Sequence, residues 1–257
     1  MKYGSLFAGI GGIDLGLERA GMECTWQVEI DPFCQKVLQK HWPNIKRYSD
    51  VREVGKHNLE PVDLVAGGFP CQDVSLAGLR KGLEGKRSTL WSEFFRIVCD
   101  LQPRWVLAEN VPGLLSSDNG EFIRVILRDL ASISFDAEWN VLPAAVFGAP
   151  HIRERVFIIA YPKNDDGECR RPLIPTSAIT RDLAININPF SKTDWNGTWI
   201  DRKDESSYIR NFPEPIFYRM DDGVPNRVER LRATGNAVVP QVAEWIGRRI
   251  MEANQCK

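Results

Sequence analysis

The sequence predicts an α/β fold, in which helices cover both faces of a mainly parallel sheet. Apolar strand patterns alternate with helical patterns through the first 160 residues, an arrangement typical of β–α–β units. A glycine-rich turn follows the first expected strand, and an acidic residue closes the second. From about residue 164 the pattern changes, which predicts a smaller and more irregular region.

The order of the elements follows from the periodicity of the apolar residues. Strands are expected at residues 3–7, 24–28, 62–66, 105–108, 137–141 and 156–160. Helices are expected between them at residues 13–20, 33–41, 89–101 and 121–134. A last helix over residues 238–251 carries Val242, Trp245, Ile246 and Ile250 on one face, so it could return to pack on the first domain.

Turn formers and breakers crowd the stretch from about residue 164 to about residue 229. Its aromatic residues are scattered without a clear period. We therefore expect a main domain of residues 1–163 plus 232–257 and a small irregular domain of residues 164–231.

The composition is that of an ordinary soluble globular protein, with 43% apolar and 26% charged residues among 257. No run of about 18 apolar residues occurs, so no transmembrane helix is expected. The first residues, MKYGSLFAGIGG, lack a signal-peptide pattern. These observations predict a cytoplasmic protein without a membrane partner.

The composition disfavours a metal site, and the net charge of the whole chain disfavours general attraction to nucleic acid. The six cysteines show no C-x-x-C pair and there are only three histidines, so we expect free thiols and no metal. The net charge is −1, so any nucleic-acid contact requires a local concentration of positive charge.

The glycine-rich turn SLFAGIGG joins the first strand to the first helix, where backbone can approach a ligand closely. Glu29 follows twenty residues after Gly9, the position of an acidic residue that binds a ribose in nucleotide-binding α/β folds. NAD, FAD and S-adenosylmethionine all fit this pattern. The G-x-G-G form mildly favours S-adenosylmethionine, whereas a plain turn with a solvated Glu29 is the alternative.

The stretch GGFPCQDVS follows the apolar run at 62–66 and places Cys71 at the mouth of a strand. Taken alone, a cysteine is more often a small buried hydrophobe than a nucleophile.

Five segments together carry a family resemblance. SLFAGIGGIDLGLERAG, GGFPCQDVS, AENVPGL, HIRERVFIIA and TGNAVVPQVAEWIG occur in the order of the C5-cytosine DNA methyltransferase family. The resemblance covers the first 160 residues and about the last 25. The short chain is similar to compact members of the family from phages and prophages. It implies a Rossmann-like S-adenosylmethionine-dependent methyltransferase sheet with a small target-recognition domain, and methyl transfer to C5 of a flipped-out cytosine in double-stranded DNA.

The resemblance also implies the catalytic residues. Cys71 would add to C6 of the ring, and Glu109 would contact N3 and the exocyclic amine, with a pKa that its apolar strand could raise. Arg153 and Arg155, two apart in expected extended backbone, would contact the cytosine carbonyl and the neighbouring phosphate. A surface Glu109, or arginines paired around Glu154, are the alternatives. His151 stands where the family usually has Gln, and the base that removes the C5 proton is not identified.

For S-adenosylmethionine, and S-adenosylhomocysteine as product, the resemblance implies binding residues from several segments. These are Phe7, Ala8, Gly9, Gly11, Gly12, Glu29, Ile30, Asp50, Val51, Gly68, Pro70, Leu90, Asn236 and Ala237.

DNA contacts are expected from a loop over residues 72–88, which is similar to the family's mobile loop and concentrates positive charge. An ordinary solvated basic loop is the alternative. The implied partners are double-stranded DNA and a cognate restriction endonuclease, with the chain a monomer. The loop candidates are Gln72, Ser75, Arg80, Lys81, Lys86 and Arg87, and those of the smaller domain are Arg170, Arg171, Arg202, Lys203 and Arg210.

Three other functions remain open. A tRNA cytosine methyltransferase has the same fold, although PCQDVS resembles the DNA enzymes. A non-catalytic DNA-binding relic would not need Cys71, Glu109, Arg153 and Arg155 together. An NAD(P) oxidoreductase would explain the glycine turn but give the Pro70-Cys71 pair no role.

Overall fold

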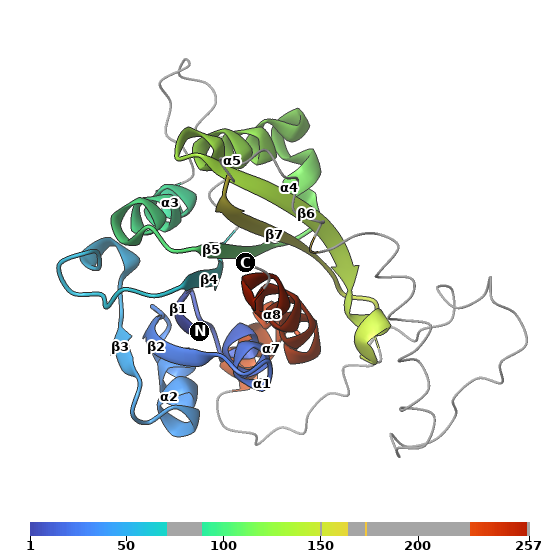
Figure 1. The fold of residues 1–257 in the computed structure, drawn as a ribbon. Coiled ribbons are helices and arrows are strands. Elements are labelled where there is room, and N and C mark those ends of the chain that lie inside the picture. Colours follow the sequence, from blue (N-terminus) through green and yellow to red (C-terminus); the bar gives the residue numbers. More distant parts are fainter. Residues whose placement is uncertain (71–88, 150, 164–172, 174–226, 256–257) are drawn as a thin grey trace, which may run out of the picture.

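The computed structural model describes residues 1–70, 89–149, 151–163, 173 and 227–255. Within these residues a seven-stranded sheet has the order β3-β2-β1-β4-β5-β7-β6 (Figure 1). Neighbouring strands from β3 to β5 are parallel, whereas β7 is antiparallel to both β5 and β6. The strands are β1 (Lys2–Leu6), β2 (Glu23–Val28), β3 (Lys46–Tyr48), β4 (Leu64–Gly68), β5 (Trp105–Asn110), β6 (Phe135–Pro143) and β7 (Glu154–Pro162).

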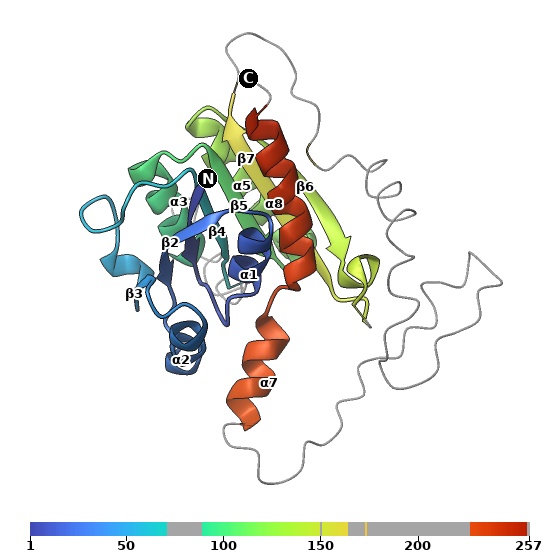
Figure 2. The ribbon, with the colours of Figure 1, turned by 60° about the horizontal axis from the view of Figure 1, so that its bottom comes forward.

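Helices pack on both faces of this sheet and create two cores. One core joins the sheet to α3 and α5, and the other joins it to α1 and α8; Figures 1 and 2 show these two pairs on opposite sides. The described helices are α1 (Gly12–Arg19), α2 (Pro32–His41), α3 (Thr89–Leu101), α4 (Gly113–Ser116), α5 (Glu121–Ser132), α7 (Arg227–Asn236) and α8 (Pro240–Gln255), with short 3-10 turns η1 (Val51–Glu53), η3 (Ser117–Gly120) and η4 (Ala144–Phe147).

The local sequence explains where α2 begins and how α8 packs. The side chain of Asp31 accepts hydrogen bonds from the backbone N–H of Phe33 and Cys34, and Pro32 occupies the first helical position of α2. Helix α8 buries Val242, Ala243, Ile246 and Ile250 on one stripe, which packs on α1.

The predicted alternation of strands and helices and the cover on both faces are confirmed, as is the return of the last helix to the first domain. Strand β3 and helix α7 were not predicted. Strand β3 has three residues, too few to show a strand period. Helix α7 has no apolar stripe: of its apolar residues only Ala233 is buried, while Val228 and Leu231 are exposed. Strands β6 and β7 form a hairpin-like antiparallel pair rather than a further β–α–β unit.

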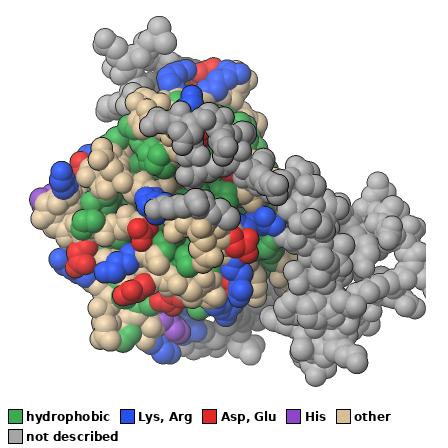
Figure 3. All heavy atoms as spheres, viewed as in Figure 1, with side chains coloured by type: hydrophobic (Ala, Val, Ile, Leu, Met, Phe, Trp, Pro, Cys, Tyr) green, Lys and Arg blue, Asp and Glu red, His purple; other side chains and the backbone are tan. Residues whose placement is uncertain are grey.

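Most of residues 164–231 lie outside the described residues, so the smaller domain and its five basic candidates stay predictions. Leu173 is described and packs in the core beside α8. No helix in the described part is long and apolar enough to cross a membrane. Lys and Arg side chains intermingle with Asp and Glu over the described part of the face in Figure 3.

Candidate active site

The carboxyl ends of β4 and β5 meet at one edge of the sheet. Gly68 of β4 lies beside Glu109 of β5 in the parallel register, and Pro70 follows two residues after Gly68. Glu109 and the chain leading to Cys71 therefore share the edge at which ligands bind in such folds. Besides the five candidates of the smaller domain, seven predicted site residues lie outside the described residues: Cys71, Gln72, Ser75, Arg80, Lys81, Lys86 and Arg87.

Glu109 is a buried carboxyl with a cationic partner. Its side chain lies among β4, β5 and β7, the residue is only 7% exposed, and Nε of Arg155 lies 3.0 Å from its Oε1. Burial raises the pKa of Glu109 to about 7, although Arg155 and Arg153 act to lower it. The carboxyl can therefore change protonation state near neutral pH, and the charged partner of Arg155 is Glu109 rather than Glu154.

Two neighbours shape the position of Glu109 and of the chain before Cys71. A Cβ atom at Gly68 would lie 2.5 Å from Oε2 of Glu109, so a larger residue there would require this carboxyl to move. Nδ2 of Asn110 donates to the carbonyl oxygen of Phe69 at 2.8 Å, and its Oδ1 accepts from the N–H of Val111 at 2.9 Å. Asn110 thus fixes the peptide just before Pro70. The sequence analysis missed this role, although AENVP places Asn110 directly after Glu109.

Arg153 takes a different course from the one predicted. Its φ is +30°, and β7 begins only at Glu154, so the expectation of extended backbone is wrong here. Its Nη2 donates to the carbonyl oxygens of Gly235 at 2.5 Å and Ala237 at 2.7 Å. Arg153 therefore reaches across to the junction of α7 and α8.

His151 is half-buried near these arginines. Burial lowers the pKa of His151, and Arg153 and Arg155 lower it further. Its Nδ1 is buried without a hydrogen-bond partner in the described part of the chain.

The glycine turn and Glu29 form a cradle that fits an adenosine ribose. The carboxylate of Glu29 accepts from the N–H of Gly9 and of Asp31, both at 2.7 Å, and burial raises its pKa. A carboxylate has further lone pairs for two hydroxyl groups. A Cβ atom at Gly9 would meet no other described residue within 4 Å, and the neighbouring Ile30 is 65% exposed. Open space, a buried acceptor and an exposed apolar side chain therefore lie together.

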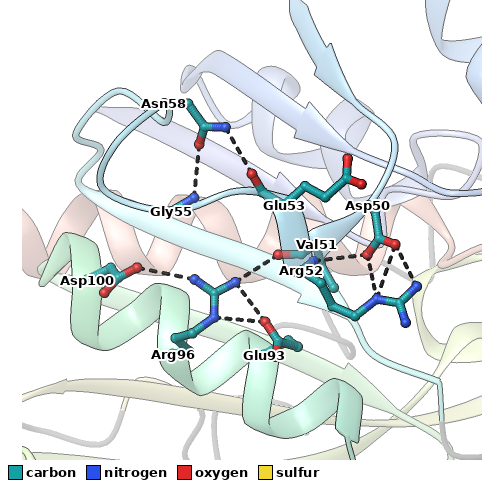
Figure 4. A network of polar contacts seen from close by, with 9 residues as sticks. All are labelled: Asp50, Val51, Arg52, Glu53, Gly55, Asn58, Glu93, Arg96 and Asp100. Atoms are coloured by element: carbon teal, nitrogen blue, oxygen red, sulfur yellow. Dashed lines mark hydrogen bonds and ion pairs between the residues drawn. The ribbon is translucent and has the colours of Figure 1, made fainter.

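A second segment of the expected cofactor site is held by α3 (Figure 4). Nη2 of Arg96 donates to the carbonyl oxygen of Val51 at 2.9 Å, while the same guanidinium pairs with Glu93 and Asp100. The carboxylate of Asp50 accepts from the backbone and side chain of Arg52. These contacts hold the chain from Asp50 to Arg52 in place, and the binding of cofactor by Asp50 and Val51 stays a prediction.

The other expected cofactor residues fall into three groups. Phe7 and Leu90 are partly buried against the core that contains α3. Asn236 is exposed and Ala237 half-buried at the α7–α8 junction. The same edge of the fold also includes Ala8, Gly11 and Gly12 of the glycine turn.

A buried polar cluster that the sequence analysis missed lies beneath the glycine turn. The carboxylate of Asp14 accepts from Oγ of Ser5 at 3.1 Å and from Nε2 of Gln27 at 2.9 Å. Burial raises the pKa of Asp14 to about 6. An acidic residue on the apolar face of the first helix was the available signal. In the described part of the chain, no cluster of three His, Cys, Asp or Glu side chains could hold a metal ion.

Comparison with known proteins shows the family of the chain. The sequence profile of the family described as C-5 cytosine-specific DNA methylase matches residues 1–207. Type II methyltransferase M.BsuFI of Bacillus subtilis is 31% identical over 89% of this chain and 53% of its own length. Type II methyltransferase M.HhaI of Haemophilus parahaemolyticus is 34% identical over 64% of this chain and 50% of its own length. The chain spans about half the length of the curated relatives it matches.

Among solved structures, the Dnmt2 methyltransferase of S. pombe superimposes with a TM-score of 0.64 over 99% of both chains at 16% identity, which supports the fold. The sheet with its glycine turn and edge carboxyl thus defines a Rossmann-like methyltransferase. The chain belongs to the C-5 cytosine-specific DNA methylase family.

Proposed function

We propose that this protein transfers a methyl group from S-adenosylmethionine to C5 of cytosine in double-stranded DNA. The observation that carries this proposal is the buried Glu109–Arg155 pair at the edge where the chain enters Cys71. Membership of the family and the type II names of its relatives support the same reaction. Those names also support a cognate restriction endonuclease as a partner.

The chemistry explains why a thiol and a carboxyl are needed together. Cytosine C5 is a poor nucleophile, so the thiolate of Cys71 first forms a bond to C6 and breaks the ring's aromaticity. Protonated Glu109 donates to N3 and stabilises the charge that develops on the ring. C5 would then form a bond to the sulfonium methyl group of S-adenosylmethionine, whose S–CH3 bond breaks so that S-adenosylhomocysteine leaves. Removal of the C5 proton by a base returns electrons to the ring and expels the Cys71 sulfur from C6.

Arg155 has two roles in this proposal. It holds the carboxyl of Glu109 in one orientation, and it faces the expected position of the cytosine carbonyl oxygen. A guanidinium can serve both because it carries five N–H donors in a fixed plane. The sequence predicted the carbonyl and phosphate contacts for Arg153 and Arg155 together; with Arg155 at the carbonyl, the phosphate contact falls to Arg153.

The glycine turn with Glu29 would hold the cofactor, which supplies an electrophilic methyl group on a sulfonium when bound. Glu29 would accept from the ribose hydroxyls, and the open space at Gly9 would admit the methionine side. Ile30 would contact the adenine. Because a stacked base cannot reach the sheet edge, the target cytosine has to leave the duplex, with the loop over residues 72–88 contacting the phosphates.

Expression in a bacterium without cytosine methylation, followed by bisulfite sequencing, tests this function and gives the target sequence. We expect a single short motif to become methylated, and Cys71→Ala to abolish that signal. Cys99→Ala, which removes an exposed thiol on α3, is the matched control and should leave methylation intact.

Purified protein should also form a stable covalent complex with a duplex that carries 5-fluorocytosine at the target, because fluorine cannot leave C5 as a proton does. Unmethylated DNA with a methylated tRNA would show a tRNA enzyme instead. Binding of DNA without any methyl transfer would show a non-catalytic relic.

A further inference from the structure

The segment Gly235–Val239, named here the closing segment, joins α7 to α8. We propose that Arg153 is a positioning residue that clamps this closing segment onto the catalytic edge and so supports the cofactor turn. This inference rests on the proposed function, because it assigns the closing segment to the binding of S-adenosylmethionine. It goes beyond the expected phosphate contact of Arg153 and makes a separate prediction about cofactor affinity in the absence of DNA.

The contacts of Arg153 are those of a clamp. One nitrogen, Nη2, donates to the carbonyl oxygens of Gly235 and Ala237, which are 82 and 84 residues away along the chain. The last carbonyls of a helix have no partner inside the helix, and α7 ends at Asn236. A cation at a helix C-terminus satisfies these oxygens and interacts favourably with the helix dipole. Arg153 therefore fixes the point at which α7 stops and the chain turns into α8.

The backbone at Arg153 is shaped for this reach. A φ of +30° is rare for a residue with a side chain, and such conformations persist where surrounding contacts hold them. The N–H of Ala144 donates to the carbonyls of Ile152 at 2.8 Å and Arg153 at 3.2 Å, which fixes the turn from the other side. Without the turn, Arg153 would enter β7 as extended backbone. The contacts with the closing segment thus depend on a strained turn at Arg153. A contact with a phosphate could be made from extended backbone and would not require this turn.

The closing segment, which Arg153 holds, also packs against the glycine turn. A Cβ atom at Gly12 would overlap the carbonyl oxygen of Val238, so the closing segment lies directly on the start of α1. Val238, Val239 and Val242 line one small hollow together with Arg153 and Arg155. The closing segment is therefore held between Arg153 on one side and the glycine turn on the other.

This arrangement links the two halves of the proposed site. Arg155 fixes Glu109, and two residues earlier Arg153 fixes the segment that contains Asn236 and Ala237. The start of β7 thereby positions both the catalytic carboxyl and the expected cofactor contacts. Because the clamp uses Nη2, other N–H groups of the guanidinium stay available to a phosphate, so the two roles need separate measurements.

Three measurements on purified Arg153→Gln separate them: hydrogen exchange of residues 234–239 without ligand, affinity for S-adenosylmethionine without DNA, and affinity for DNA as a function of salt. The clamp predicts faster exchange of the closing segment and cofactor binding weakened about tenfold or more, because hydrogen bonds from a charged donor are lost. Arg248→Gln, which removes an exposed cation of α8 paired with Glu244, is the matched control and should change neither.

Unchanged exchange and unchanged cofactor affinity would overturn the clamp. If DNA affinity alone falls, with a salt dependence smaller by about one phosphate contact, Arg153 acts only on the DNA. If Arg153→Gln does not fold, Arg153→Lys decides, since lysine keeps the cation but lacks the fork that spans two carbonyls; exchange equal to wild type in that variant would again overturn the proposal. A wild-type protein that binds cofactor but methylates no DNA would refute the proposed function and leave the exchange measurement valid.

Discussion

Two buried carboxyls, Asp14 beneath the glycine turn and Glu109 at the sheet edge, show how similar burial serves different ends. Burial raises the pKa of both, to about 6 for Asp14 and about 7 for Glu109. Asp14 accepts from the neutral donors of Ser5 and Gln27, whereas Glu109 faces the cation of Arg155. Asp14 is fully enclosed, while Glu109 lies beside the chain that leads to Cys71. Burial alone thus does not distinguish Asp14 from the proposed catalytic acid Glu109; the partner and the access to the edge do.

The largest expected effect comes from the carboxyl at the edge. Glu109→Gln keeps an oxygen that Arg155 can bind but removes the exchangeable acid, so methylation should fall about 100-fold or more. Cofactor affinity and melting temperature should stay close to wild type, because the amide fills the same space. Single-turnover methylation and calorimetric titration measure the two. A loss of cofactor affinity as large as the loss of rate would mean that Glu109 shapes the site rather than taking part in the chemistry.

The enclosed carboxyl should affect stability instead. Asp14→Ala leaves the hydroxyl of Ser5 and the amide of Gln27 without their acceptor, and we expect it to lower the free energy of unfolding by about 3 kcal/mol. Urea unfolding measures this. Arg124→Ala, which removes an exposed ion pair with Glu121, is the control and should cost less than about 1 kcal/mol. A similar small cost for Asp14→Ala would show that the buried cluster is not a brace.

The smallest expected effect is a pH dependence of stability. Because the pKa of Asp14 is raised in the folded state, this carboxyl favours folding below about pH 4, and that contribution is lost as the pH rises through about pH 6. Relative to Asp14→Asn, wild type should therefore gain about 2 kcal/mol on acidification from about pH 7 to about pH 4. Urea unfolding of both proteins across this range measures the difference, and parallel curves would contradict it.

The sequence predicted the sheet and the position of Glu109 because strand periodicity and the ends of parallel strands are local signals. It did not predict the course of Arg153, since neither a left-handed turn nor a contact with residues 82 positions away leaves a local pattern. Asp14 and Asn110 were missed for a related reason: their partners come from other strands or from another strand's end. Cys71 lies outside the described residues, so its role as the nucleophile, which the family resemblance implies, stays a prediction.

Helix α8 has a consequence for how the protein assembles during synthesis. It supplies Val242, Ala243, Ile246 and Ile250 to a core whose other members come largely from the first half of the chain. On the ribosome, α1 alone covers that face of the sheet until α8 has been made, and the apolar surface that stays exposed recruits chaperones or favours aggregation. The closing segment reaches the glycine turn only at that late moment. Cofactor binding should therefore begin only after α8 has been synthesised, so that chains that stop before α8 carry no competent site.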